Sequence, residues 1–265
     1  MLQYQLEILA IQWITESLSF VISLVQIEVI LLTKRTITPP FYEIGPKNYI
    51  YGDDVLDLAI AADKASKKYA VDVIFTTPFM EIRRVAEETK NLFVFAPHMD
   101  PLPIGRGLAD ILPEAVVAAG AVGVMLNHCE KPLTLSVLNK TIERAKSLGL
   151  LTIVCADSIQ EAAAIAHFSP DIIVAEPTEL IGTGQTSSAD YVEKSTNAIK
   201  SVNPNILVLQ SAGIKSGSDV YDIIFSGADA TGTSSGVANA PDRAAMADEM
   251  IRAVREAWDA RNSDQ

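Results

Sequence analysis

The feature that most constrains the fold is a regular alternation that begins at Phe41 and continues to the C-terminus. Short apolar or β-branched runs alternate with helical stretches of about ten to sixteen residues, a pattern typical of repeated βα units on a parallel sheet. Eight strands are predicted, at Tyr42–Gly45, Val71–Phe75, Leu92–Ala96, Gly123–Leu126, Leu151–Cys155, Asp171–Ala175, Ile206–Gln210 and Ala228–Gly232. The helices between them are predicted at Asp53–Lys68, Met80–Thr89, Pro113–Ala119, Thr134–Leu148, Ser158–His167, Ser188–Val202, Gly217–Ser226 and Asp242–Arg261.

The number of units predicts how the sheet closes. Eight βα units in 265 residues fit an α/β protein with a closed (β/α)8 barrel, whereas open doubly wound sheets more usually stop at five or six strands. No Gly-x-Gly-x-x-Gly turn follows the first strand, so the signature of a dinucleotide-binding sheet is missing. Pro113 suits a first helical turn, and Ser158 and Asp242 are candidate N-caps. We predict one barrel domain over residues 36–265.

The first 35 residues form a separate predicted region. The stretch from Gln5 to Leu32 is strongly apolar, yet Glu16 near its middle would be costly inside a bilayer, by roughly 2.5 kcal/mol or more. No basic residue precedes Lys34, so the positive start of a signal peptide is missing. Three interpretations stay open: an extra surface helix, a weak membrane association, or a mis-assigned start with the true one near Leu32. Stable membrane association is not expected.

Charge and cysteine content exclude several classes of protein. The formal net charge is -12, without any run of Lys or Arg, which argues against binding to nucleic acid or an anionic membrane. The two cysteines, Cys129 and Cys155, have no metal-binding spacing and fit a reduced cytoplasmic protein. The three histidines lie far apart in sequence, so no metal site is predicted.

Chemically useful side chains follow the predicted strands. His128 and Glu130 come directly after one apolar run, Glu176 after another, and Lys47 after the first. A barrel brings the carboxyl ends of all its strands to one mouth, where ligands bind. Glu176 could then remove a proton from a carbon next to a carbonyl, while His128 polarises the oxygen.

Small residues after the last two strands predict an anion site. Gly213 and the run Ser234-Ser235-Gly236, together with Gly182, offer backbone N–H groups suited to a phosphate, and Lys47 adds a positive charge. Each of these residues alone has an ordinary structural explanation as a turn or surface residue. Their combination on one barrel face favours a site. His98 and Asp100, after the third strand, stay open between structural and functional roles.

Several of these motifs occur together in one known family. The runs Leu126-Asn127-His128, Glu176-Pro177 and Glu179-Leu180-Ile181-Gly182-Thr183-Gly184 resemble the archaeal-type branch of the triosephosphate isomerases. The resemblance extends from about Phe41 to the C-terminus and is densest over residues 118–184. It implies a cofactor-free aldose-ketose isomerase of glycolysis and gluconeogenesis that acts on a small phosphorylated sugar through an enediolate and forms a homo-oligomer, a dimer or tetramer.

The resemblance also implies roles for individual residues. His128 takes the position of the family's electrophile, which is a neutral histidine at a helix N-terminus in triosephosphate isomerases. Glu176 takes that of the catalytic base, Lys47 that of the substrate-binding lysine, and Glu130 that of a carboxylate that assists the histidine. The implied substrate or phosphate contacts are Gly45, Lys47, Ile181, Gly182, Gly213, Ser234, Ser235 and Gly236. Pro177–Gly184 resembles the family's mobile lid.

Two departures from the family pattern concern the substrate. The chain has Gly45-Pro46-Lys47 where the family has Asn-x-Lys, so the asparagine amide is missing, and Lys215 stands where the branch usually has Ser. Glyceraldehyde 3-phosphate and dihydroxyacetone phosphate are the first expectation. A related sugar phosphate such as a tetrulose phosphate is the alternative, and a non-catalytic phosphate-binding relative is a further one. No Lys ends the sixth predicted strand, which disfavours a Schiff-base aldolase.

Overall fold

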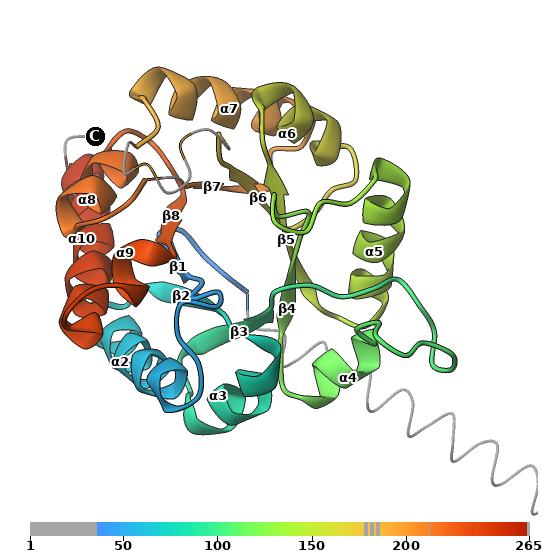
Figure 1. Cartoon of the computed structure of the whole chain (residues 1–265). Coiled ribbons are helices and arrows are strands. Elements are labelled where there is room, and N and C mark those ends of the chain that lie inside the picture. Colours follow the sequence, from blue (N-terminus) through green and yellow to red (C-terminus); the bar gives the residue numbers. More distant parts are fainter. Residues whose placement is uncertain (1–35, 178–179, 181–182, 184–185, 212, 264–265) are drawn as a thin grey trace, which may run out of the picture. The chain divides into compact units, whose positions relative to one another are not determined.

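Eight parallel strands close into a barrel in chain order (Figure 1). The structure is a computed structural model, and it describes residues 36–177, 180, 183, 186–211 and 213–263. The strands are β1 (Phe41–Ile44), β2 (Asp72–Thr76), β3 (Leu92–Ala96), β4 (Gly123–Leu126), β5 (Leu151–Ala156), β6 (Ile172–Ala175), β7 (Leu207–Gln210) and β8 (Ala230–Thr233). The predicted TIM barrel is therefore confirmed. The predicted division at residue 35 stays a prediction, because residues 1–35 lie outside the described part.

Helices surround the strands on the outside of the barrel (Figure 1). They are α2 (Asp53–Tyr69), η1 (Phe79–Glu81), α3 (Ile82–Glu88), α4 (Pro113–Ala118), α5 (Leu135–Ser147), α6 (Ile159–Ala166), α7 (Ala189–Val202), α8 (Gly217–Phe225), α9 (Ser235–Ala238) and α10 (Arg243–Ser263). The single predicted helix over 80–89 is divided into the 3-10 turn η1 and the short helix α3. The sequence did not predict α9, because one turn is too short to show an amphipathic period.

The predicted helix starts have the expected chemistry. The Ser158 hydroxyl accepts a hydrogen bond from the Glu161 N–H at 3.2 Å and caps α6. Asp242 Oδ1 accepts one from the Ala245 N–H at 2.9 Å, just before α10 begins. Pro113 is in the first turn of α4, where its missing N–H costs no hydrogen bond. All three sequence predictions are confirmed.

The inside of the barrel is a packed apolar core. Its buried members come from alternate strand positions, because successive side chains of a strand point to opposite faces. They include Phe41, Ile74, Phe93, Phe95, Ile153, Ile172, Val174 and Leu209. The Phe95 ring occupies the place where a Cβ atom on Gly123 would lie. Only glycine at position 123 therefore lets β4 pass this ring without displacing it.

A second apolar layer lies between the strands and the helices. Tyr42 is fully buried there, and its hydroxyl lies 2.9 Å from Met250 Sδ on α10. Because Tyr42 and Phe41 are neighbours on β1, one side chain belongs to the outer layer and the other to the barrel interior. The strands therefore contribute to both cores, which explains why most of their residues are apolar.

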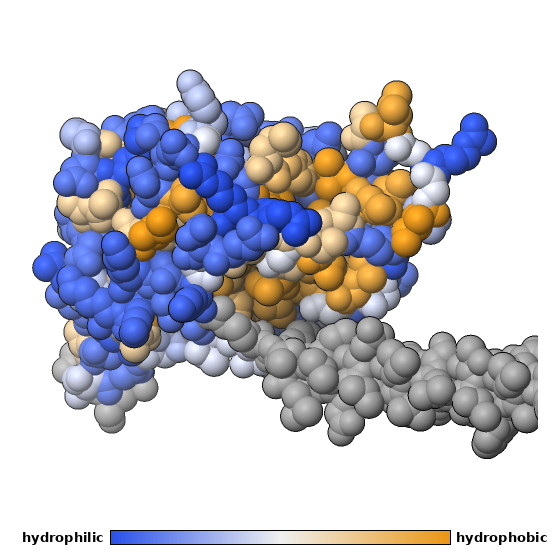
Figure 2. Space-filling model, turned by 90° about the horizontal axis from the view of Figure 1, so that it is seen from below, coloured by the Kyte–Doolittle hydropathy of each residue, from blue (hydrophilic) through white to orange (hydrophobic). Residues whose placement is uncertain are grey.

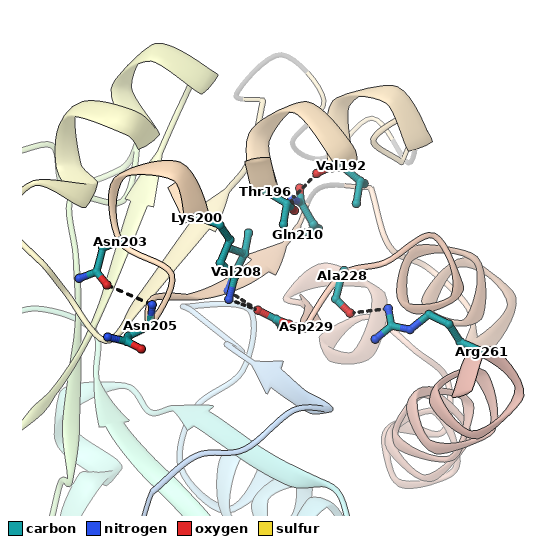
Figure 3. Close-up of polar contacts among 10 residues, drawn as sticks. All are labelled: Val192, Thr196, Lys200, Asn203, Asn205, Val208, Gln210, Ala228, Asp229 and Arg261. Atoms are coloured by element: carbon teal, nitrogen blue, oxygen red, sulfur yellow. Dashed lines mark hydrogen bonds and ion pairs between the residues drawn. The ribbon is translucent and has the colours of Figure 1, made fainter. Parts of the chain in front are cut away.

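Polar contacts tie the last strands to the surrounding helices (Figure 3). Lys200 Nζ of α7 lies 3.0 Å from Asp229 Oδ2, and this carboxylate also accepts the Val208 N–H at 3.0 Å. The buried Gln210 amide donates to Thr196 Oγ1 of α7 at 3.3 Å. Arg261 of α10 donates to the Ala228 carbonyl at 3.1 Å. These contacts fix α7 and α10 against β7 and β8.

Most exposed side chains in the view of Figure 2 are hydrophilic, and apolar ones gather on part of this face. The exposed large apolar side chains of the described residues include Met80, Ile104 and Leu108, which follow β2 and β3. No helix within the described ranges is long and apolar enough to cross a membrane.

Candidate active site

A cavity of about 660 Å³ opens at the carboxyl ends of the strands. Loops from around the barrel contribute to its wall, as the fold predicts. The lining residues that carry polar groups include Glu43, Lys47, Thr76, His98, His128, Glu130, Glu176, Ser211, Lys215, Thr233, Ser234 and Ser235. Gly45 and Gly213 line it as well. Residues far apart in sequence therefore meet at one mouth, as predicted.

Lys47 and Glu130 form an ion pair across the cavity, with Lys47 Nζ 2.8 Å from Glu130 Oε1. Lys47 has a φ angle of 49°, in the left-handed region that few residues other than glycine adopt. Burial lowers the pKa of Lys47, but the hydrogen bond and charge of Glu130 outweigh it, so the pKa is raised. The hydrogen bond from Lys47 lowers the pKa of Glu130. Both groups are charged at neutral pH.

His128 has a defined tautomer when it is neutral. Its Nδ1 atom accepts a hydrogen bond from the Glu130 backbone N–H at 3.1 Å, so the ring proton belongs to Nε2. Burial lowers the pKa of His128, and the charge of Lys47 lowers it further. The sequence resemblance implied a helix N-terminus here. The structure instead has a turn, in which the Lys131 N–H donates to the His128 carbonyl at 2.7 Å, and α5 begins at Leu135.

Asn127 holds this turn in place, and the sequence analysis gave it no role. Its amide donates to the Cys155 carbonyl at 3.0 Å and to Glu161 Oε1 at 3.1 Å, and its Oδ1 accepts the Leu133 N–H at 2.9 Å. Its φ angle is 57°, a conformation that Asn tolerates better than most residues. The sequence indication for this role is the position of Asn127 directly after a strand and directly before His128.

Glu176 follows β6, and its backbone N–H donates to the Ala156 carbonyl at 3.1 Å. Burial raises the pKa of Glu176, against an opposing hydrogen bond from Ser211 and the charge of Lys47. A carboxylate with a raised pKa binds a proton more strongly than an exposed one does. The position is therefore suited to proton transfer.

The loops after β7 and β8 pack closely against each other. Thr233 Oγ1 donates to the Ile214 carbonyl at 2.9 Å. A Cβ atom on Gly236 would lie 2.5 Å from the same carbonyl oxygen, so Gly236 permits this approach. Ser234 and Ser235 line the cavity at the start of α9. Ile181 and Gly182, and most of the predicted lid, lie outside the described residues.

The loop after β3 also reaches the cavity. His98 Nε2 lies 3.2 Å from Asp100 Oδ1, and Asp100 Oδ2 accepts the Ile111 N–H at 2.7 Å. These contacts connect the two ends of the loop. His98 and Asp100 therefore have a structural role, and both also line the cavity.

Glu43 is a charged lining residue that the sequence did not lead us to expect at the site. It lies within β1, in the run Phe41-Tyr42-Glu43-Ile44, and only 7% of it is exposed. A charged residue inside an otherwise apolar strand was the available signal, since such residues are rarely buried without a partner.

The fold and the cavity define a TIM-barrel protein with a polar site at the carboxyl ends of its strands. The model of the family "Triosephosphate isomerase" matches residues 47–250. The chain is 36% identical to triosephosphate isomerase of Saccharolobus solfataricus over 217 residues, which are 80% of this chain and 95% of that protein. It is 35% identical to that of Methanothermus fervidus over 203 residues, 76% of this chain and 91% of that protein. It is 34% identical to that of Methanocaldococcus jannaschii over 210 residues, which are 78% of this chain and 95% of that protein.

These matches cover most of the barrel and nearly all of each relative. The chain belongs to the triosephosphate isomerase family, and it is an enzyme of the isomerase class.

Proposed function

We propose that this protein interconverts glyceraldehyde 3-phosphate and dihydroxyacetone phosphate. Its family membership supports the reaction, and one observation carries the assignment of the site: Lys47, His128 and Glu176 line a single cavity. The three residues supply a cation, a neutral imidazole N–H and a buried carboxyl group, which are the groups that an enediolate mechanism needs.

Glu176 is the proposed base. Its carboxylate takes a proton from the carbon next to the substrate carbonyl, and the electron pair of that C–H bond forms the C=C bond of the enediolate. A proton then moves from the oxygen on one of the two carbons to the oxygen on the other, with His128 beside both oxygens in the proposed arrangement. The same carboxyl group returns its proton to the neighbouring carbon, which completes the isomerisation. Burial raises the pKa of Glu176, which makes the carboxylate a stronger base.

His128 is the proposed electrophile. Because Nδ1 accepts the Glu130 N–H, Nε2 carries the proton of the neutral ring and can donate to the substrate oxygen. Triosephosphate isomerases are known to use a neutral histidine in this way. The lowered pKa of His128, caused by burial and by Lys47, keeps the ring neutral at physiological pH.

Lys47 and the loops after β7 and β8 are the proposed anion-binding groups. Lys47 carries the charge that attracts a phosphorylated substrate, and the side chain of Glu130 holds Lys47 in position. Gly213, Ser234 and Ser235 present backbone and hydroxyl groups to the phosphate. The proposed phosphate-binding residues also include Gly236, and Ile181 and Gly182, which lie outside the described residues.

A longer sugar phosphate is the second candidate substrate. The observation in its favour is the size of the cavity, about 660 Å³, which lies within the range of about 300–1,000 Å³ that houses drug-sized ligands. Gly45 adds no side chain to this wall. A tetrulose phosphate uses the same proton transfer and needs more room.

A substrate panel tests both candidates. The purified enzyme is assayed with triose and tetrose phosphates, and exchange of the proton next to the carbonyl is followed by NMR in deuterated water. We expect the highest kcat/KM with the triose phosphates, with deuterium incorporated at the reacting carbon. A higher value with a tetrose phosphate supports the second candidate. Phosphate binding without isomerisation or exchange would identify a non-catalytic relative and exclude both.

We further propose a homo-oligomer of two or four subunits in the cytoplasm. Ile104 and Leu108 support assembly, because they expose large apolar side chains on the loop after β3, and such surfaces favour association. Both cysteines are free thiols, which suits a reducing compartment. Sedimentation of the parent and of Leu108→Asp tests the assembly, and a smaller particle is expected for the variant.

A further inference from the structure

Glu43 carries a buried carboxyl group on the wall of the cavity, and the reaction described above assigns it no role. It lies in the middle of β1, directly beside Gly232 of β8 in the strand register. Its Oε1 atom accepts a hydrogen bond from Thr76 Oγ1 of β2 at 2.6 Å. Glu43 and Thr76 both line the cavity. Thr76 therefore holds one oxygen of the carboxyl group, and the residue borders the cavity in which we propose that substrate binds.

Two glycines make room for this carboxyl group. A Cβ atom on Gly45 would lie 2.8 Å from Glu43 Oε1, and one on Gly232 would lie 2.9 Å from Oε2. Real Cβ atoms do not approach other atoms so closely, so a side chain at either position would displace the carboxyl group. The carboxyl group of Glu43 therefore fills space that side chains at positions 45 and 232 would otherwise need. All three of these residues line the cavity.

Four charged or titratable groups lie close enough to Glu43 to interact with it electrostatically. Lys47, further along the same segment, lowers the pKa of Glu43, and Glu176, which follows β6, raises it. Glu43 in turn raises the pKa of Tyr42, the preceding residue, and that of Cys155 on β5. Lys47 is paired with Glu130, and no ion pair within the described ranges includes Glu43 itself. The pKa of Glu43 is raised to about 7, mainly by burial and to a smaller extent by the negative charge of Glu176. The hydrogen bond from Thr76 and the positive charge of Lys47 oppose this rise. Near neutral pH, a large part of the group is protonated.

We propose that Glu43 is a substrate-binding residue, whose protonated carboxyl group donates a hydrogen bond from Oε2 to an oxygen atom of the sugar phosphate. The proposal rests on the proposed function and adds a contact to it. Because Thr76 donates to Oε1, the proton of the neutral group belongs on Oε2. Negative charge develops on the substrate oxygens in an enediolate, so a donor at this wall stabilises it and a carboxylate anion would repel it.

The glutamine variant separates a donor from an anion. In Glu43→Gln, the amide oxygen can still accept from Thr76, and the amide N–H can donate to the substrate as the protonated carboxyl does. We expect kcat/KM within about threefold of the parent at pH 6. As pH rises above about 7, the parent should lose kcat/KM because Glu43 ionises, and the Gln variant should not show this loss.

The leucine variant removes the donor while filling a similar volume. Glu43→Leu should lower kcat/KM by about 10- to 100-fold, the usual effect of losing one hydrogen bond to a charged group. Glu249→Gln is the matched control, because Glu249 accepts one backbone hydrogen bond, from Gly217 at 2.8 Å, and is not among the residues of this cavity. The control should keep the parent's kcat/KM and its pH profile. Circular dichroism confirms that each variant is folded.

A binding experiment distinguishes this proposal from the proposed function. Calorimetry with glycerol 3-phosphate and with inorganic phosphate needs no turnover. Glu43→Leu should weaken glycerol 3-phosphate about tenfold and leave inorganic phosphate unchanged, because only the former places a sugar oxygen beside residue 43. If the parent isomerises no sugar phosphate but this difference is found, the proposed function fails and the role of Glu43 stands. A Leu variant with unchanged kcat/KM and unchanged affinity for glycerol 3-phosphate would overturn the proposal, as would a parent that binds no glycerol 3-phosphate or equal weakening of both ligands.

Discussion

Glu43 Oε1 lies 2.8 Å from the position that a Cβ atom on Gly45 would take. The two residues are therefore coupled: a side chain at position 45 and the carboxyl group of residue 43 cannot occupy this wall together in the present arrangement. The family motif that this chain resembles has Asn where Gly45 stands. The absence of a side chain at position 45 therefore leaves the space that the buried carboxyl group of Glu43 occupies.

The coupling predicts the behaviour of Gly45→Asn. The new side chain should displace the Glu43 carboxyl from Thr76, and we expect kcat/KM to fall by about tenfold, because Glu43 then no longer donates its proposed hydrogen bond to the substrate. The double variant Gly45→Asn with Glu43→Ala removes the obstacle. It should be more active on triose phosphates than Gly45→Asn alone, a non-additive result typical of residues in contact.

Triose and tetrose phosphates are assayed in parallel for both variants. If the open wall serves a longer sugar, Gly45→Asn should lower activity on the tetrose phosphate more than on the triose phosphate. An unchanged kcat/KM on every substrate would show that a side chain at position 45 does not meet Glu43.

Glu176→Asp tests the proposed base. The shorter side chain withdraws the carboxylate by about one methylene from the proton that it removes, and a misplacement near 1 Å can lower a rate by roughly 10²-fold. We expect kcat to fall by about that factor, while the inhibition constant of inorganic phosphate stays within about twofold of the parent. Near-normal kcat in this variant would assign the base to another residue.

Ser235→Asp tests the proposed anion site. A carboxylate at the start of α9, where Ser235 lines the cavity, would repel a phosphate group. Inorganic phosphate should then no longer compete with substrate. Ser201→Asp adds the same charge at an exposed position of α7 and serves as the control. Equal phosphate affinity in both variants would place the anion site elsewhere.

A chain that begins at Thr33 should be folded and active. Every described strand and helix, and every residue of the cavity, lies after residue 36. Circular dichroism and kcat/KM of the shortened chain, compared with the full chain, check this. Loss of folding in the shortened chain would show that the barrel depends on the first residues.

The barrel could be predicted from the sequence because its strands and helices differ in period. Strands such as Ile172–Ala175 are continuously apolar, and the helices between them repeat every 3.6 residues. The short helix α9 has no such period, and it was missed. The strand β8 begins at Ala230 and not at the predicted Ala228, and the side chain of Asp229, just before it, accepts the Val208 N–H.

The cavity could be predicted only in part. His128, Glu176 and Lys47 follow strands, so the topology alone brings them to one mouth. The tautomer of His128 depends on a backbone N–H of the next turn, which no residue type specifies. Glu43 lies within a strand, and its carboxyl reaches the cavity because Gly45 and Gly232 leave it space. The fit between Glu43 of β1 and Gly232 of β8 depends on how these two strands pair, so the sequence of one strand does not reveal it.

The ionisation of Glu43 should also appear in the stability of the protein. Burial raises the pKa of Glu43 from 4.5 to about 7, so the folded protein holds this proton over a pH range in which the unfolded chain has released it. The contribution to stability is complete below pH 4.5 and is lost as pH rises through about 7, and it amounts to ~3 kcal/mol. Glu43→Gln has no proton to lose. Its Tm should match that of the parent near pH 4.5 and exceed it at pH 8 by about 6 to 12 °C, at roughly 2–4 °C for each kcal/mol.

Thermal unfolding at a series of pH values, followed by circular dichroism, measures this difference. Glu249→Gln changes the net charge by the same amount and should follow the parent at every pH. If the Tm of Glu43→Gln instead declines between pH 5 and pH 8 in parallel with the parent, Glu43 is ionised in the folded protein throughout this range. The hydrogen bond from Thr76 and the charge of Lys47 would then outweigh the cost of burying the carboxylate.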